Sequence, residues 1–147
     1  MDRFTLKPIG IIHTPYKTTE NCPKGDYHGK GVKAYIELQP EYRDGLMDLD
    51  GFSHLILVWV FHESEGYELI ASPPHDDEQH GVFATRSPKR PNPIGLTVVK
   101  LKEIEGTTLY IEDPDMVDGT PLLDIKPYLL PPETLGEVKR GWLEKKK

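Results

Sequence analysis

Apolar and polar side chains alternate along several stretches of this 147-residue chain. In residues 31–38, apolar side chains occupy every second position and are separated by Lys33, Tyr35 and Glu37. Such alternation predicts a strand with one buried face. By the same criterion, or by branched and aromatic composition, we predict strands over residues 7–13, 82–85, 94–104, 108–112 and 122–125. Gly106 lies between two of them and predicts a hairpin turn.

Residues 52–62 form the most apolar run in the chain. Their branched and aromatic side chains favour a strand that is covered on both faces, with a buried helix as the alternative. His54 and His62 are eight positions apart and would share one face of that strand. His62 is therefore either a histidine satisfied at the end of a strand or a contact for a ligand.

Two short helices are predicted, over residues 41–49 and at the C-terminus over residues 134–145. Thr134 and Glu137 resemble a capping box, although Gly141 weakens the interior of that helix. Fourteen prolines and thirteen glycines divide the chain into short pieces, which suits a β fold better than a helical one. We therefore predict a mainly β protein, a small antiparallel β-barrel of six to seven short strands with short helices.

Composition and charge narrow the class of protein. The net charge of −6 argues against a protein that coats nucleic acid nonspecifically, but it permits a local basic groove. Cys22 is the single cysteine, so no internal disulfide forms. No apolar run is long enough to span a bilayer, and the first residues lack the form of a signal peptide. We expect one cytoplasmic domain over residues 1–147, with no membrane partner.

A basic segment stands out against this acidic background. Residues 81–102 contain five Lys or Arg and no Asp or Glu, whereas the whole chain has 24 acidic and 18 basic residues. Prolines at positions 88, 91 and 93 restrict its backbone. Arg86 and Arg90 carry planar guanidinium groups that suit carboxylate or phosphate. The segment is either a stiffened loop that binds an anionic ligand or a proline-rich turn with solvated charges.

An acidic cluster follows, and it consists of Asp113, Asp115, Asp118 and Asp124 with the neighbouring Lys126. Asp-Pro and Asp-Gly pairs are common in surface turns that end strands. Alternatively, this turn faces the basic loop across one pocket, where its carboxylates accept hydrogen bonds from ribose hydroxyls or an amino group.

Familiar cofactor motifs are missing from the sequence. Residues 75–80 contain histidines and acids but lack the ligand spacing of a zinc site, so we interpret them as a solvated loop and expect no metal. There is no GxGxxG after a strand and no Walker-type GxxxxGK[ST]. A Rossmann nucleotide site and a P-loop are therefore not expected.

Four motifs, in order, resemble the TsaA-like (TrmO-type) family. They are Ile9-Gly-Ile-Ile with Thr14-Pro-Tyr-Lys17, Phe52-Ser-His-Leu with Val60-Phe-His62, Gly81-Val-Phe-Ala-Thr-Arg-Ser with Arg90-Pro-Asn-Pro-Ile-Gly95, and Val117-Asp-Gly-Thr-Pro with Asp124-Ile-Lys-Pro-Tyr128. The resemblance covers about residues 5–130 and leaves residues 131–147 as an extension. It implies an S-adenosylmethionine-dependent methyltransferase with a β-barrel core, usually a homodimer. The best-understood branch methylates the exocyclic nitrogen of threonylcarbamoyl-adenosine next to the tRNA anticodon.

The resemblance also implies site residues. The cofactor pocket would draw on Pro23, Gly25, Asp26, His62, Glu63, Arg86, Leu96, Thr97, Asp115, Val117, Asp118, Gly119 and Thr120. The side that binds the anticodon loop of tRNA would be lined by Arg86, Arg90, Asn92, Lys126 and Tyr128. Asp118, Asp124 and Arg86 are the candidate catalytic residues. Two alternatives use the same fold: a noncatalytic barrel that binds RNA or a small ligand, and a methyltransferase that acts on a small molecule.

Overall fold

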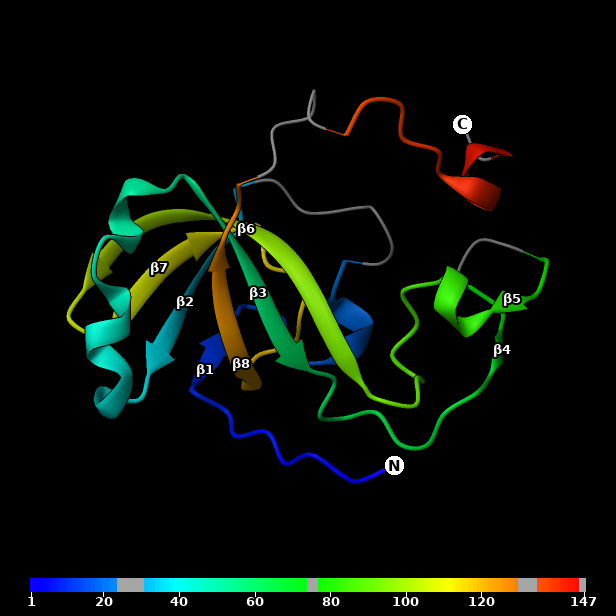
Figure 1. The fold of residues 1–147 in the computed structure, drawn as a ribbon, viewed down its shortest axis with the longest axis horizontal. Coiled ribbons are helices and arrows are strands. Elements are labelled where there is room, and N and C mark those ends of the chain that lie inside the picture. The colour runs from blue at the N-terminus through cyan, green and yellow to red at the C-terminus, as the bar shows by residue number, and fades with distance from the viewer. Residues whose placement is uncertain (24–30, 74–76, 130–134, 146–147) are drawn as a thin grey trace.

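The computed structural model describes residues 1–23, 31–73, 77–129 and 135–145. Its centre is a closed barrel in which antiparallel neighbours follow the order β1-β2-β7-β6-β3-β8 (Figure 1). The barrel strands are β1 (Gly10–His13), β2 (Lys33–Leu38), β3 (His54–Val60), β6 (Ile94–Glu105), β7 (Thr108–Glu112) and β8 (Thr120–Pro127). The predicted fold class, a small antiparallel β-barrel with short helices, is confirmed.

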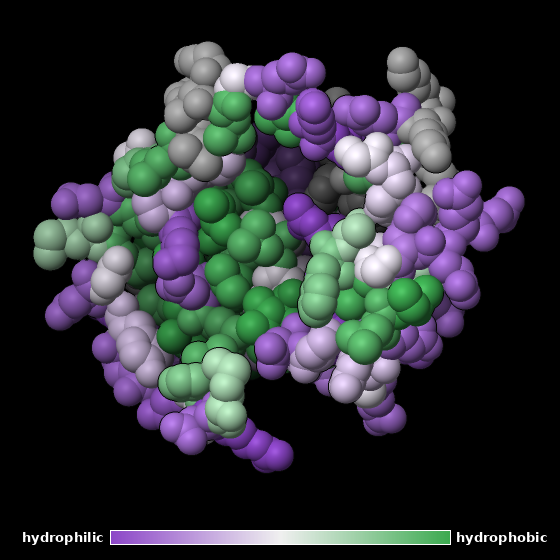
Figure 2. Space-filling model, turned by 45° about the vertical axis from the view of Figure 1, so that its right-hand side comes forward, coloured by the Kyte–Doolittle hydropathy of each residue, from purple (hydrophilic) through white to green (hydrophobic). Residues whose placement is uncertain are grey.

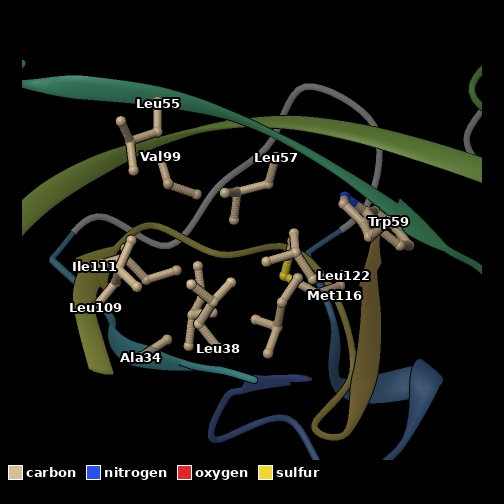
Figure 3. Close-up of a cluster of buried hydrophobic side chains, with 12 residues drawn as sticks. Ala34, Leu38, Leu55, Leu57, Trp59, Val99, Leu109, Ile111, Met116 and Leu122 are labelled. Carbon is tan, nitrogen blue, oxygen red and sulfur yellow. The ribbon is translucent and has the colours of Figure 1, made fainter. Parts of the chain in front are cut away.

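Side chains that point into the barrel make one hydrophobic core (Figure 3). They are Ile12, Ala34, Ile36, Leu38, Leu55, Leu57, Trp59, Val99, Leu109, Ile111, Met116 and Leu122. β2 alternates between exposed and buried positions, as its sequence predicts. The strand predicted over residues 52–62 is confirmed as β3, and its outward side chains Ile56, Val58 and Val60 are half-buried, so its second face is only partly covered within one chain. The helical alternative for this run was wrong, because its partners β6 and β8 hold it in a ladder.

The predicted hairpin is formed by β6 and β7. Gly106 adopts a φ of 62° at its turn, which is the left-handed region that glycine enters without a steric penalty. The strand predicted over residues 7–13 begins only at Gly10, and the one predicted over residues 122–125 is longer at both ends.

Residues 82–85 are not a strand. β4 (Ile70–Ala71) pairs with β5 (His80–Gly81), and the chain then makes a single 3-10 turn, η4 (Val82–Ala84). The amide and the hydroxyl of Thr85 both donate to the carbonyl of Val82, at 3.0 and 2.8 Å, and close this turn. A local hydrogen bond from a threonine therefore overrides the strand-like composition.

The predicted helices also differ from the structure. Residues 41–49 fall in two 3-10 helices, η2 (Pro40–Leu46) and η3 (Leu49–Gly51), separated at Asp48, whose φ is 68°. Near the C-terminus, residues 135–140 are not helical, and Gly141, with a φ of 57°, begins η6 (Gly141–Lys145). Thr134 of the expected capping box lies outside the described residues. A further 3-10 turn is η1 (Thr19–Asn21). In the described part of the chain, no helix is long and apolar enough to cross a membrane.

Antiparallel pairing brings three connections to one end of the barrel, which we call the loop end. They join β1 to β2, β3 to β6, and β7 to β8. Their described residues are 14–23, 31–32, 61–73, 77–93 and 113–119. The opposite end carries the β2–β3 connection, the β6–β7 turn and the end of β8. The basic loop and the acidic turn, 30 or so residues apart in the sequence, thus emerge from the same end.

Candidate active site at the loop end of the barrel

Asp118 is held firmly in the turn between β7 and β8. Its Oδ1 accepts the backbone amide of Thr14 at 3.0 Å and lies 3.2 Å from His13 Nδ1. Lys17 Nζ donates to its Oδ2 at 3.0 Å. Partial burial opposes ionisation, but the hydrogen bonds from Lys17 and Thr14 outweigh it and lower the pKa of Asp118 below its ordinary value. The carboxylate is therefore ionised at neutral pH.

The rest of this turn is tied to the barrel by its own backbone and hydroxyl groups. Thr14 Oγ1 donates to the carbonyl of Met116 at 2.9 Å, and Thr120 Oγ1 donates to that of Val117 at 2.6 Å. The amide of Gly119, which has a φ of 86°, donates to the carbonyl of Ile12. The side chains of Val117 and Thr120 are buried, so they shape the turn from within.

Asp115 belongs to a hydrogen-bond chain that starts inside the barrel. Trp59 Nε1 donates to Thr97 Oγ1 at 3.0 Å, and Thr97 Oγ1 donates to Asp115 Oδ1 at 2.5 Å. A side chain at Gly95 would meet the Trp59 ring, because a Cβ there would lie 2.4 Å from a ring carbon. The indole also packs edge-on against Phe61 with ring centroids 4.4 Å apart. β3, through Trp59, and β6, through Thr97, thereby help to orient the Asp115 carboxylate.

The two arginines of the basic loop differ in their surroundings. Arg90 Nη1 donates to the carbonyls of Thr85 and Ser87 at 2.9 and 3.1 Å, so it closes its own loop. Arg86 is exposed, and its Nη1 lies 3.5 Å from the carbonyl of Leu96 on β6. This contact puts Arg86 beside the strand that carries Thr97.

The remaining predicted residues of the loop end differ in exposure. His62, Glu63 and Asn92 are exposed at the two ends of the β3–β6 connection. Pro23 is half-buried at the end of the described part of the β1–β2 connection. Gly25 and Asp26 lie outside the described residues.

Lys126 and Tyr128 lie away from the loop end, whereas Asp124 lies at the level of Leu96, since both residues pair with Val58. Asp124 is on the outside of β8 opposite Val58, and its Oδ2 pairs with Lys126 Nζ at 2.9 Å. Tyr128 follows the end of β8, where its amide donates to the carbonyl of His54. Eight residues of strand separate Tyr128 from Thr120, about 25 Å at the usual rise. One chain therefore does not bring Lys126 and Tyr128 to the acidic turn.

Three further residues beside Asp118 were not predicted: His13, Lys17 and Tyr35. They line a shallow pocket of about 260 Å³ with Thr14, Pro15, Lys33, Ala34 and Asp118. Lys17 belongs to the Thr-Pro-Tyr-Lys motif, and a basic residue next to a strand end was the signal that could have pointed to it. Among the described residues, no group of three or more His, Cys, Asp or Glu is arranged to hold a metal ion.

Fold and site together define a small closed β-barrel whose polar loops gather at one end. A family model described as the tRNA-methyltransferase O N-terminal domain matches residues 11–132, and the chain belongs to this family. It is 48% identical over 139 residues to a probable S-adenosyl-L-methionine-binding protein of Pyrococcus abyssi, covering 95% of this chain and 76% of that protein. It is 36% identical to a tRNA (adenine(37)-N6)-methyltransferase of Escherichia coli, covering 98% of this chain and 66% of that protein.

Solved structures agree with the family. The crystal structure of TrmO from Pseudomonas aeruginosa superposes with a TM-score of 0.79 at 31% identity. The match covers 95% of this chain and 62% of that one, so the chain spans less than two thirds of this relative.

Proposed function

We propose that this protein is an S-adenosylmethionine-dependent methyltransferase that acts on tRNA. The observation that carries the proposal is that Asp115, Asp118 and Arg86 all belong to connections at the loop end, in a chain of this family. Relatives named as S-adenosyl-L-methionine-binding proteins and as tRNA (adenine(37)-N6)-methyltransferases support the cofactor and the class of substrate.

The residues of the loop end fit the cofactor in charge. S-Adenosylmethionine presents an ammonium, a carboxylate and ribose hydroxyls, and its sulfonium supplies an activated methyl group when bound. Asp115 and Asp118 are carboxylates suited to the ammonium or the hydroxyls. Because both acids are held by neighbouring groups, little reorganisation is needed to bind.

For the acceptor, we propose the exocyclic nitrogen of threonylcarbamoyl-adenosine next to the anticodon. Its threonyl carboxylate needs a cation, and Arg86 is the better of the two loop arginines because Arg90 is engaged with its own loop carbonyls. The protein's main task is to align the nitrogen with the methyl group and to exclude water. Asp118, whose lowered pKa keeps it ionised, is suited to accept hydrogen bonds rather than to act as a strong base in the methyl transfer.

We also propose a homodimer formed through the outer face of β3 and β6. Cross-strand neighbours on this face are apolar: Val58 pairs with Leu96, and Ile56 pairs with Val98. Leu96 and Val98 are 49% and 40% exposed, an unusual arrangement for a free surface. Figure 2 shows apolar side chains gathered in a broad area on the side where β3 and β6 cross the front of Figure 1. Lys126 is the cross-strand partner of Ile56 at the edge of this face, so a dimer formed here would place Lys126 beside the partner subunit.

Calorimetric titration with S-adenosylmethionine and S-adenosylhomocysteine tests the cofactor. We expect saturable binding that Asp118→Asn weakens about tenfold, since a hydrogen bond to a charged group contributes about 1.5–3 kcal/mol. Asp44→Asn is the matched control, because Asp44 is exposed on η2 at the opposite end of the barrel. If the folded wild-type protein binds neither molecule, the methyltransferase proposal is wrong and a noncatalytic barrel replaces it.

A further inference from the structure

Three aromatic rings form a row across the outside of the barrel, next to the acidic turn. His13 on β1 and Tyr35 on β2 are cross-strand partners, and Tyr35 and Tyr110 on β7 are partners in turn. The His13 and Tyr35 rings stack with centroids 4.8 Å apart and planes 24° apart. Tyr35 and Tyr110 are 6.4 Å apart and tilted by 42°. We call these three residues the aromatic row.

The aromatic row faces solvent. Tyr35 and Tyr110 are 39% and 38% exposed, although each sits in the middle of a paired strand. Cross-strand aromatic pairs stabilise sheets, and that alone would account for two rings in contact. A purely structural pair, however, does not require a third ring, nor the pocket of about 260 Å³ that adjoins Tyr35 and His13.

Charges are divided across the aromatic row. On its side toward the loop end, Lys33 and Lys100 flank Glu112 in one register, and Lys102 Nζ lies 3.9 Å from the Glu112 carboxylate. On the other side the neighbouring outward positions include Glu37, whose Oε2 lies 3.4 Å from His13 Nε2, and Glu105. At the β6 end of the row, the exposed Glu103 is the cross-strand partner of Tyr110. The row therefore has one margin with an excess of lysine and one acidic margin.

We propose that the aromatic row is a stacking platform for unpaired nucleotides of an RNA. Because His13 covers one face of Tyr35, bases stack on the exposed parts of Tyr35 and Tyr110, since aromatic faces bind any base. The phosphates run along the lysine margin and away from Glu37, Glu103 and Glu105. His13 joins the platform to the site, because its Nδ1 lies 3.2 Å from Asp118 Oδ1. A strand on the platform is thus continuous with the site at the loop end. The identification of the RNA as a tRNA rests on the proposed function; the stacking does not.

Fluorescence anisotropy with a labelled eight-nucleotide unstructured RNA tests the platform at low salt. We expect Tyr35→Leu and Tyr110→Leu each to weaken binding about fivefold or more, the effect usual for loss of one stacked base. Tyr35→Phe keeps the ring and should bind like the wild type. Tyr67→Leu is the matched control, because Tyr67 is 60% exposed on the β3–β6 connection, outside the row. Leucine preserves an apolar strand residue, and thermal unfolding checks that each variant is folded.

Equal affinity of the wild type and both leucine variants would overturn the platform, as would loss of binding in Tyr67→Leu alone. Charge has its own test: Lys33→Gln should reduce the slope of log affinity against log salt by about one. Methyl transfer to tRNA is measured in parallel. Ring-dependent RNA binding without any methyl transfer would refute the proposed function and leave the platform standing, whereas methyl transfer with ring-independent RNA binding would refute the platform alone.

Discussion

Thr97 is the residue whose replacement tests the internal organisation of the site most sharply. It is 3% exposed, and its hydroxyl both accepts from Trp59 Nε1 and donates to Asp115 Oδ1. Thr97→Val keeps the shape but leaves the indole N–H without this acceptor and the carboxylate without this donor. A buried unsatisfied donor costs about 1–3 kcal/mol, and a hydrogen bond to a charged group contributes about 1.5–3 kcal/mol. Because Asp115 is only half-buried and water can replace its lost donor, we expect a fall in the free energy of unfolding in the lower part of the summed range, about 2–4 kcal/mol.

Urea unfolding measures this change, and Thr97→Ser is the matched control because it retains the hydroxyl. The serine variant should lose only about 1 kcal/mol, the cost of one buried methyl group. Calorimetry on the same variants should show weaker binding of S-adenosylmethionine for valine than for serine, because Asp115 loses the hydrogen bond from Thr97 that helps to orient it. A valine variant within about 0.5 kcal/mol of the wild type, with unchanged cofactor affinity, would refute the hydrogen-bond chain as an organising element.

Three further predictions concern the Asp118 carboxylate, the close approach of Gly95 to Trp59, and the proposed dimer face. Because the pKa of Asp118 is lowered in the folded state, its ionised form stabilises the fold above the ordinary Asp pKa of about 3.9, and this stability is lost as the pH falls through the lower folded-state pKa. The free energy of unfolding should therefore fall less steeply with decreasing pH in Asp118→Asn than in the wild type. An identical pH profile for the two proteins would contradict this prediction. Gly95→Ala should destabilise the barrel by about 1–3 kcal/mol in thermal unfolding, since its Cβ would lie 2.4 Å from the Trp59 ring. Gly45→Ala should not, because a Cβ there would meet no atom of the described residues within 4 Å. Val98→Lys places a charge in the proposed dimer interface and should convert the dimer to a monomer in analytical ultracentrifugation. Met47→Lys is the control and should leave the dimer intact, because Met47 is 78% exposed on the β2–β3 connection. A wild-type protein that is a monomer would refute this interface.

Local patterns predict most of the barrel. The alternation in β2, and the pair of strands around Gly106, need only the period of the strand and the conformational freedom of glycine. The turn at Val82–Ala84 could not be predicted, because its residues favour a strand and Thr85 closes it with its own hydrogen bonds. Likewise, the composition of residues 52–62 does not reveal that its outward side chains remain half-buried rather than covered.

The candidate site divides in the same way. The predicted residues Asp115 and Thr97 are joined by a hydrogen bond, but Trp59, which donates to Thr97, was not predicted. Trp59 and Thr97 are 38 residues apart, and their contact depends on the register of β3 against β6, which the hydrophobic pattern does not show. Arg90 has the same sequence signal as Arg86, yet it closes its own loop. Tyr128 comes only ten residues after Asp118, but β8 carries it to the far end of the barrel.

Methyl transfer to tRNA tests the central proposal most directly. Tritium-labelled S-adenosylmethionine is incubated with the protein and with tRNA that carries, or lacks, the threonylcarbamoyl group on the adenosine next to the anticodon. We predict that the modified tRNA incorporates at least about tenfold more label than the unmodified tRNA, because the base is positioned through the contact between Arg86 and the threonyl carboxylate. Arg86→Lys should reduce that preference, since lysine lacks the planar fork. Folded protein that binds S-adenosylmethionine but transfers no methyl group to either tRNA would contradict the proposal.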